Sequence, residues 1–339
     1  MCGIFGTINY RISEEKALDC LNRMIHRGPD GYGIWQEDGV TLGHRRLSIL
    51  DLSENGRQPM SYADGRYEIT FNGEVYNFIE IRRELMSKGY TFKSDTDTEV
   101  IIAAFIEWGE KCLDMFNGMW TFAIWDRLEK KMFISRDRFG IKPLYIANQG
   151  GRIAFASEMK AIMPLLDKTD INRSLIERYL KNPHYEMQDE CLVEEIKRFP
   201  AGFCAWIDAS GNIEMKRWWN TLDHIVDVPA AYEEQVEKFR ELFLDSCRIR
   251  MRSDVTLGTA LSGGLDSSAT ICAMAHIMNG ADNDRVNNDW QHAFVATFAG
   301  TPFDETRYAR QVTDHLGINS TFLNIDESVS YDELLIYLH

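Results

Sequence analysis

The hydrophobic pattern changes about two thirds of the way along the 339-residue chain, and this change limits the fold more than any other feature. Before it, many short strand-like runs are interrupted by few helical patterns. The strand-like runs are residues 3–9, 40–42, 67–71, 121–125, 132–135 and 153–156, and the helical patterns are residues 17–25, 78–88 and 98–108. Many strands with few crossover helices favour stacked antiparallel sheets flanked by helices. We expect an α+β domain, a four-layer αββα sandwich of antiparallel sheets.

After a polar connection near residues 220–228, the pattern becomes that of an α/β protein. Residues 232–250 predict a long amphipathic helix, and they are followed by a strand, a Gly-rich turn, a helix and a second strand. These four predicted segments are residues 255–261, 262–266, 267–278 and 294–298. Such a unit belongs to a parallel sheet, which needs further crossovers, so we expect an incomplete α/β domain. The predicted boundaries are 2–219 for the first domain, 220–231 for a linker and 232–339 for the second domain.

Composition narrows the class of function. The chain has 37 Lys and Arg against 52 Asp and Glu, a net charge of −15, which disfavours a broad nucleic-acid surface. Its seven cysteines are widely spaced and form no CxxC pair, so neither a disulfide framework nor a zinc site is expected. The amino terminus lacks the pattern of a signal peptide, and no run reaches the ~18 apolar residues of a membrane span. We expect a cytoplasmic protein that acts on small molecules, with no nucleic-acid or membrane partner.

Cys2 is the first candidate catalytic residue. If Met1 is removed, Cys2 carries both a thiol and a free α-amine, whose pKa of about 7.7–8.0 allows it to act as a general base near neutrality. Nucleophile and base would then share one residue, as in amino-terminal nucleophile hydrolases. A cysteine at position 2 is by itself weak support for catalysis.

The sequence around Cys2 strengthens that hypothesis, because it resembles the start of class II glutamine amidotransferases and further blocks follow in order. The blocks begin Met1-Cys2-Gly3-Ile4-Phe5-Gly6 and continue with His26-Arg27-Gly28-Pro29-Asp30-Gly31, His44-Arg45-Arg46-Leu47-Ser48-Ile49, Asn72-Gly73-Glu74-Val75-Tyr76-Asn77, Ser94-Asp95-Thr96-Asp97-Thr98-Glu99 and Arg136-Asp137-Arg138-Phe139-Gly140. The resemblance covers essentially the whole first domain. It implies glutaminase activity.

The resemblance also implies roles in a glutamine pocket. Cys2 would attack the side-chain amide, and Asn72 and Gly73 would donate hydrogen bonds to the resulting oxyanion. Arg46 would bind the α-carboxylate of glutamine, and Glu74 and Asp97 its α-ammonium group. The substrate-binding set is completed by Leu47, Ser48, Ile49 and Leu50. His26 and His44 are expected to hold loops rather than to act as bases, and residues 27–30 to form scaffold.

A second motif, Ser262-Gly263-Gly264-Leu265-Asp266-Ser267-Ser268, lies between a predicted strand and helix. Small residues there expose backbone N–H groups, and a helix N-terminus favours anions, so the motif predicts a phosphate-binding turn. It is neither a Walker loop nor a dinucleotide fingerprint. It resembles the pyrophosphate loop of the ATP pyrophosphatase family, which implies ATP as cosubstrate. Leu261 and Ala296 are further candidate ATP contacts, and Asp266 is a candidate ligand for Mg²⁺.

A glutaminase followed by a pyrophosphate loop resembles the asparagine synthetase family. That resemblance implies a ligase that passes ammonia to an ATP-activated carboxylate, aspartate being the expected acceptor. The synthetase domain of this family continues for a few hundred residues, so the second domain looks truncated here. A fragment, a split enzyme completed by a separate chain and a glutaminase-only relic all remain open, as does a homodimer. The alternatives are a sugar or peptide carboxylate as acceptor, and a non-catalytic module that binds nucleotide or glutamine.

Overall fold

The computed structural model describes residues 1–182, 189–280 and 284–324. The chain divides into two compact units, Met1–Val226 and Asp227–His339. This division lies within the predicted connection, residues 220–231. Each unit is described separately.

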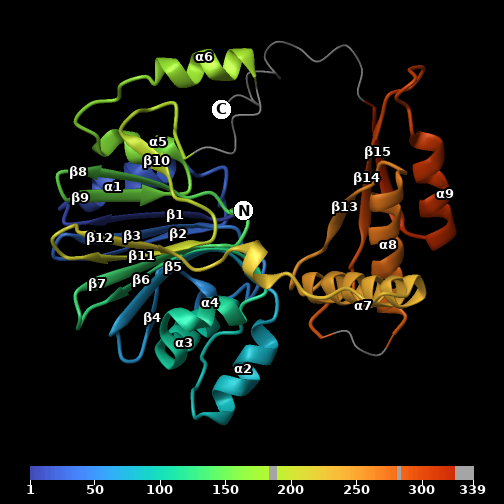
Figure 1. Ribbon diagram of the computed structural model, residues 1–339, viewed down its shortest axis with the longest axis horizontal. Coiled ribbons are helices and arrows are strands. Elements are labelled where there is room, and N and C mark those ends of the chain that lie inside the picture. The colour runs from blue at the N-terminus through green and yellow to red at the C-terminus, as the bar shows by residue number, and fades with distance from the viewer. Residues whose placement is uncertain (183–188, 281–283, 325–339) are drawn as a thin grey trace. The chain divides into compact units, whose positions relative to one another are not determined.

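The first unit contains two antiparallel sheets of six strands each (Figure 1). The first sheet has the order β10-β8-β9-β1-β3-β2 and the second β12-β11-β7-β6-β5-β4. The strands are β1 (Gly3–Ile8), β2 (Gly31–Glu37), β3 (Val40–Arg46), β4 (Met60–Tyr62), β5 (Tyr67–Val75), β6 (Gly118–Asp126), β7 (Lys131–Arg136), β8 (Tyr145–Gln149), β9 (Arg152–Ala156), β10 (Ile196–Arg198), β11 (Phe203–Asp208) and β12 (Ile213–Arg217).

Helices cover the outer faces of both sheets, which confirms the predicted four-layer arrangement. Figure 1 shows α1 and α5 along the first sheet and α2, α3 and α4 along the second. The helices of this unit are α1 (Glu14–Asn22), α2 (Phe78–Ser87), α3 (Asp97–Trp108), α4 (Cys112–Met115), α5 (Met159–Ile162) and α6 (Arg173–Lys181). Ser13 caps the N-terminus of α1, because its side chain accepts a hydrogen bond from the Lys16 N–H at 3.1 Å.

Three hydrophobic layers hold the first unit together. Ile4 packs between the two sheets, whereas its neighbour Phe5 packs between the first sheet and α1. Side chains of a strand alternate between its two faces, so a strand buried on both sides needs an unbroken apolar run. Ile101 of α3 and Phe122 of β6 belong to the third layer. Complete burial of a side chain of this size stabilises the fold by roughly 1.5–3 kcal/mol.

The second unit contains a parallel sheet of order β13-β14-β15, in agreement with the predicted α/β class. Its elements are α7 (Tyr232–Arg250), β13 (Gly258–Ala260), α8 (Leu265–Met278), β14 (His292–Thr297), α9 (Thr306–Leu316) and β15 (Asn319–Asn324). Leu261, Ile271 and Val295 lie in its core. None of the helices in the described part of the chain is long and apolar enough to cross a membrane.

The start of α8 corrects a prediction. The Gly-rich turn was expected to extend to Asp266, but the helix begins at Leu265, so Asp266 lies in its first turn. Leucine has a high helix propensity, and a carboxylate near a helix N-terminus interacts favourably with the helix dipole. The turn therefore consists of only Ser262, Gly263 and Gly264.

Candidate active site

A cavity of about 310 Å³ in the first unit brings together residues that are far apart in the sequence. Of the predicted glutamine-site residues, all except Ser48 line it: Cys2, Arg46, Leu47, Ile49, Leu50, Asn72, Gly73, Glu74 and Asp97. The Ser48 N–H instead donates to the Asp30 carboxylate at 2.7 Å. The lining residues absent from the prediction are Met1, His44, Gly56, Gln58, Phe71, Thr96, Thr98, Met119, Ile141 and Lys142.

The amino-terminal end of β1 positions Cys2 in the cavity. The Cys2 carbonyl accepts a hydrogen bond from Arg27 Nε at 2.9 Å, and the Ile4 N–H donates to Ser157 Oγ at 3.0 Å. Leu47 N–H lies 3.3 Å from Cys2 Sγ and donates to it. Burial raises the pKa of the Cys2 thiol, an effect that the Leu47 N–H, the amino terminus and Lys142 oppose.

β4 pairs with only the first part of β5. The rest of this edge of β5 is unpaired and faces the cavity. The Phe71 N–H donates to Gln58 Oε1 at 2.6 Å, and the Val75 N–H donates to Asp97 Oδ2 at 2.9 Å. Alternate amides of a strand point to the same side, so the Gly73 N–H lies on this edge between the two. Gly73 is opposite Trp120 of β6. The backbone N–H and C=O groups of Trp120 both bond to Asp137, so neither is available to Gly73. Within the described residues, the Gly73 N–H therefore has no acceptor.

Asn72 supplies a second free donor. Its side chain is buried, and no described residue accepts a hydrogen bond from its Nδ2 atom. A buried amide without a hydrogen-bond partner destabilises the fold by about 1–3 kcal/mol. The Asn72 amide is therefore suited to donate a hydrogen bond to an acceptor on a ligand. A thiol that shares a cavity with two such donors is suited to acyl transfer through an oxyanion.

Gly73 is required by the close approach of β6. A Cβ atom added to Gly73 would lie 2.2 Å from Met119 O and 2.7 Å from Trp120 Cα. Any side chain at this position would force β5 and β6 apart.

Two carboxylates and one guanidinium group give the cavity its polar character. Burial raises the pKa of Asp97 to about 7, although the Val75 N–H counteracts this shift. Burial also raises the pKa of Glu74. Arg46 donates to the backbone carbonyls of Asp51 and Ser53, so the loop that follows β3 wraps around its guanidinium group.

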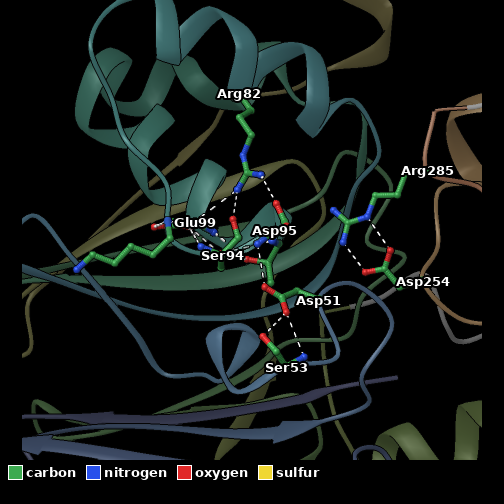
Figure 2. A network of polar contacts seen from close by, with 10 residues as sticks. Asp51, Ser53, Arg82, Ser94, Asp95, Glu99, Asp254 and Arg285 are labelled. Carbon is green, nitrogen blue, oxygen red and sulfur yellow. Dashed lines mark hydrogen bonds and ion pairs between the residues drawn. The ribbon is translucent and has the colours of Figure 1, made fainter.

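A polar network fastens that loop to the start of α3. Figure 2 shows Asp51 between Ser53 and Asp95, with the Asp95 N–H donating to Asp51 Oδ2 at 2.8 Å. Arg82 of α2 continues the network through an ion pair with Asp95. The network therefore holds the loop that surrounds the Arg46 guanidinium group against the helix that carries Asp97.

His44 is buried beside the cavity but is not arranged as a general base. Its Nε2 atom donates to Phe71 O at 3.0 Å, and burial lowers its pKa to about 3. His44 is therefore neutral at physiological pH and holds the peptide that precedes Asn72. His26 bonds to Glu158 at 2.9 Å and does not line the cavity.

The second candidate site is the turn before α8. The N-cap of α8 is Gly264, which offers no side chain to cap the helix, and the Gly264 N–H donates to Ser262 Oγ at 3.1 Å. Gly263 has a φ of +84°, and a Cβ there would lie 2.7 Å from Ala309 N. Ser267 Oγ lies 3.1 Å from Ser262 Oγ, whereas the buried Ser268 Oγ has no partner among the described residues.

The other predicted ATP contacts are dispersed around this turn. The Leu261 side chain is buried in the core of the unit, which leaves only its backbone for a ligand. Leu265 and Asp266 are exposed, and Ala296 lies exposed on β14. The described residues contain no cluster of three metal-binding side chains. Mg²⁺ bound with nucleotide needs only one or two protein carboxylates, so Asp266 fits that mode of binding.

The comparisons with known proteins agree with the two-part division. A family model described as "Glutamine amidotransferase domain" matches residues 1–219, and one described as "Asparagine synthase" matches residues 238–337. Asparagine synthetase [glutamine-hydrolyzing] 1 of Bacillus subtilis is 34% identical over 99% of this chain and 51% of its own length. Asparagine synthetase B of Escherichia coli is 33% identical over 94% of this chain and 53% of its own. The chain thus spans about half the length of these relatives.

A solved structure supports the fold. Glutamine phosphoribosylpyrophosphate amidotransferase from B. subtilis has a TM-score of 0.51 and 14% identity, over 99% of this chain and 92% of its own. At that identity the likeness concerns the fold alone.

Proposed function

Because this chain belongs to the glutamine amidotransferase family, we propose that its first unit hydrolyses glutamine to glutamate and ammonia. The observation that carries the proposal is the cavity that places the Cys2 thiol with two donors, the Asn72 amide and the Gly73 N–H. Arg46 would bind the substrate's α-carboxylate, with Leu47, Ser48, Ile49 and Leu50 around it. Glu74 and Asp97 would bind its α-ammonium group.

The chemistry follows from these positions once Met1 is removed. The terminal amine of Cys2 accepts the thiol proton, and the sulfur attacks the side-chain amide carbon of glutamine. The carbonyl π electrons move to oxygen, where Asn72 and Gly73 donate hydrogen bonds. Collapse breaks the C–N bond, and the amine returns its proton to the departing ammonia. Water then hydrolyses the γ-glutamyl thioester to glutamate.

We assign the second unit to ATP-dependent activation of a carboxylate, because the turn of Ser262, Gly263 and Gly264 precedes a helix that lacks a side-chain cap. The free N–H groups of such a helix start attract phosphate. The ATP set is Leu261, Ser262, Gly263, Gly264, Leu265, Asp266, Ser267, Ser268 and Ala296. Asp266 would hold Mg²⁺, which neutralises phosphate charge when bound.

Aspartate is the proposed acceptor, since both asparagine synthetases named above are relatives along most of the chain. Its carboxylate would attack the α-phosphorus of ATP and release pyrophosphate. Ammonia would then displace AMP and give asparagine. α7 exposes apolar side chains, among them Phe239 and Leu242. These side chains would pack against a further segment or a partner chain that completes this unit.

A covalent trap tests the glutaminase proposal without requiring turnover. A glutamine analogue with a diazoketone in place of the carboxamide alkylates a nucleophilic thiol only when the pocket binds the amino-acid end. We expect a mass increase on the Met-processed N-terminal peptide that excess glutamine suppresses. Labelling of other cysteines alone, unaffected by glutamine, would refute the assignment.

A further inference from the structure

The loop after β7 contains a conspicuous motif, Arg136-Asp137-Arg138-Phe139-Gly140, to which the proposed chemistry assigns no role. The Asp137 carboxylate accepts hydrogen bonds from the N–H groups of Trp120, Phe139, Ile141 and Lys142 at 3.0–3.2 Å. Arg136 Nε donates to Lys142 O at 2.8 Å. The motif therefore clamps the backbone of residue 142 through both its N–H and its C=O group.

The clamped residue contributes a cation to the glutamine cavity. Lys142 lines that cavity and is only 5% exposed. No described residue forms an ion pair or a hydrogen bond with its ammonium group. Burial lowers the pKa of Lys142, whereas the charges of Glu74 and Cys2 counteract that shift.

Burying most of a lysine side chain without a direct partner for its ammonium group is costly to the fold. Lysines elsewhere in this unit avoid the cost, because Lys130 pairs with Glu37 and Lys88 with Glu107 at exposed positions. A purely structural role for residue 142 would be served equally by an apolar side chain in the same clamp. The presence of a charged side chain at this position, rather than an apolar one, therefore indicates a function in the cavity.

We propose that Lys142 is a second cation of the glutamine cavity, besides Arg46, and that its ammonium group stabilises the negative charge of the Cys2 sulfur during attack. The proposal rests on the proposed glutaminase function. Lys142 forms and breaks no bond and transfers no proton; it acts through the electrostatic potential at Cys2. It lies outside the set of residues predicted to bind glutamine.

The charges around both groups are consistent with this role. The charged groups that act on Cys2 are Lys142, Asp97 and, while Met1 is present, the α-amine of Met1. The groups that act on Lys142 are Glu74, Cys2, Arg27 and Asp137.

The test is the pH dependence of Cys2 alkylation by iodoacetamide in the absence of glutamine, followed by mass spectrometry of the N-terminal peptide of the Met-processed chain. Lys142→Met removes the charge and keeps an apolar stem, Lys142→Arg keeps the charge, and Lys131→Met removes an exposed charge at the far end of β7. We expect Lys142→Met to raise the alkylation midpoint, the pH at which the rate of Cys2 alkylation is half of its maximum, by about 1–2 pH units. Glutaminase kcat/KM should fall about 10–100-fold.

Lys142→Arg should restore a midpoint close to that of the unsubstituted chain, and Lys131→Met should leave it unchanged. An unchanged midpoint in folded Lys142→Met overturns the proposal, as does a rise of the same size in Lys131→Met. The alkylation readout needs no turnover. Absence of glutaminase activity in the unsubstituted chain would therefore count against the proposed function and leave the Lys142 result interpretable.

Discussion

At the scale of single residues, the cavity depends on groups whose importance is visible only in three dimensions. The edge of β5 presents three amides, and those of Phe71 and Val75 are occupied by Gln58 and Asp97. The amide of Gly73, between them, is left for a ligand. The Asn72-Gly73 block and the holding role of His44 were predicted from the sequence, but Gln58 and Lys142 were not. Their roles depend on which edge of β5 stays unpaired, and no local pattern contains that information.

Gly73→Ala is expected to damage both fold and activity. The added methyl group would lie 2.2 Å from Met119 O, so β5 and β6 must separate, at a cost of about 1–3 kcal/mol. Urea unfolding and glutamate release measure the two effects. Gly31→Ala is the control, because nothing lies within 4 Å of its added Cβ. Equal stability of the two variants would contradict the close approach described here.

Asp97 links pH to stability. Its pKa is about 7 in the folded chain against 3.8 ordinarily, so the folded state retains a proton that the unfolded state has lost. The fold therefore loses stability as pH rises from about 4 to 7, and the full penalty is present above pH 7. Asp97→Asn should stabilise the ligand-free chain at pH 8 by about 1–4 kcal/mol, and by less at pH 5.

The same substitution should weaken glutamine binding, because it removes a charge proposed to face the α-ammonium group. In the unsubstituted chain, KM for glutamine should rise as pH falls below about 7, where Asp97 becomes protonated. Urea unfolding at the two pH values and KM across pH 5.5–8.5 measure these effects. A destabilised Asp97→Asn at pH 8 would contradict the account.

At the scale of elements, the site is assembled where a loop and a helix meet. β3 ends at Arg46, α3 begins at Asp97, and Asp51 of the loop after β3 joins that loop to α3 through the Asp95 N–H. The sequence predicted α3 within one residue and α7 at both ends. It missed β2, β4, β8, β10 to β12 and β15. Of these, β10 and β11 pair with β8 and β7, which lie far away in the sequence. Local propensity does not contain those pairings.

Asp51→Asn is expected to loosen the loop without removing a group that contacts substrate. The amide nitrogen cannot accept from the Asp95 N–H, and a charge-assisted bond of this kind contributes about 1.5–3 kcal/mol. KM for glutamine should rise about tenfold while kcat changes little. Asp38→Asn is the matched control, because Asp38 also has a positive φ and lies outside the cavity. A fall in kcat alone would contradict this reading.

At the scale of the whole molecule, the chain joins two units of different class. The antiparallel sandwich and the parallel sheet were both predicted from hydrophobic patterning, because alternation and crossover helices are properties of long segments. The proposed activities accordingly belong to different units. A defect in one unit should leave the chemistry of the other intact.

Gly263→Ala tests that independence. Its φ of +84° and the nearby Ala309 backbone leave no room for a side chain, so the turn must change shape. ATP binding, measured by equilibrium dialysis, should weaken by about tenfold or more, while glutamate release stays within about twofold. Cys272→Ser, at an exposed position of α8, should affect neither. Unchanged ATP binding in Gly263→Ala would exclude this turn as the phosphate site.

Glutamate release from glutamine by the Met-processed chain tests the central claim most directly, with Cys2→Ala as the comparison. The account predicts release by the unsubstituted chain and none by Cys2→Ala, with melting temperatures that differ little because only one half-buried sulfur is lost. Persistent release by Cys2→Ala would contradict the assignment of the nucleophile. Absence of release from a chain whose free terminus is confirmed as Cys2 would contradict the glutaminase itself.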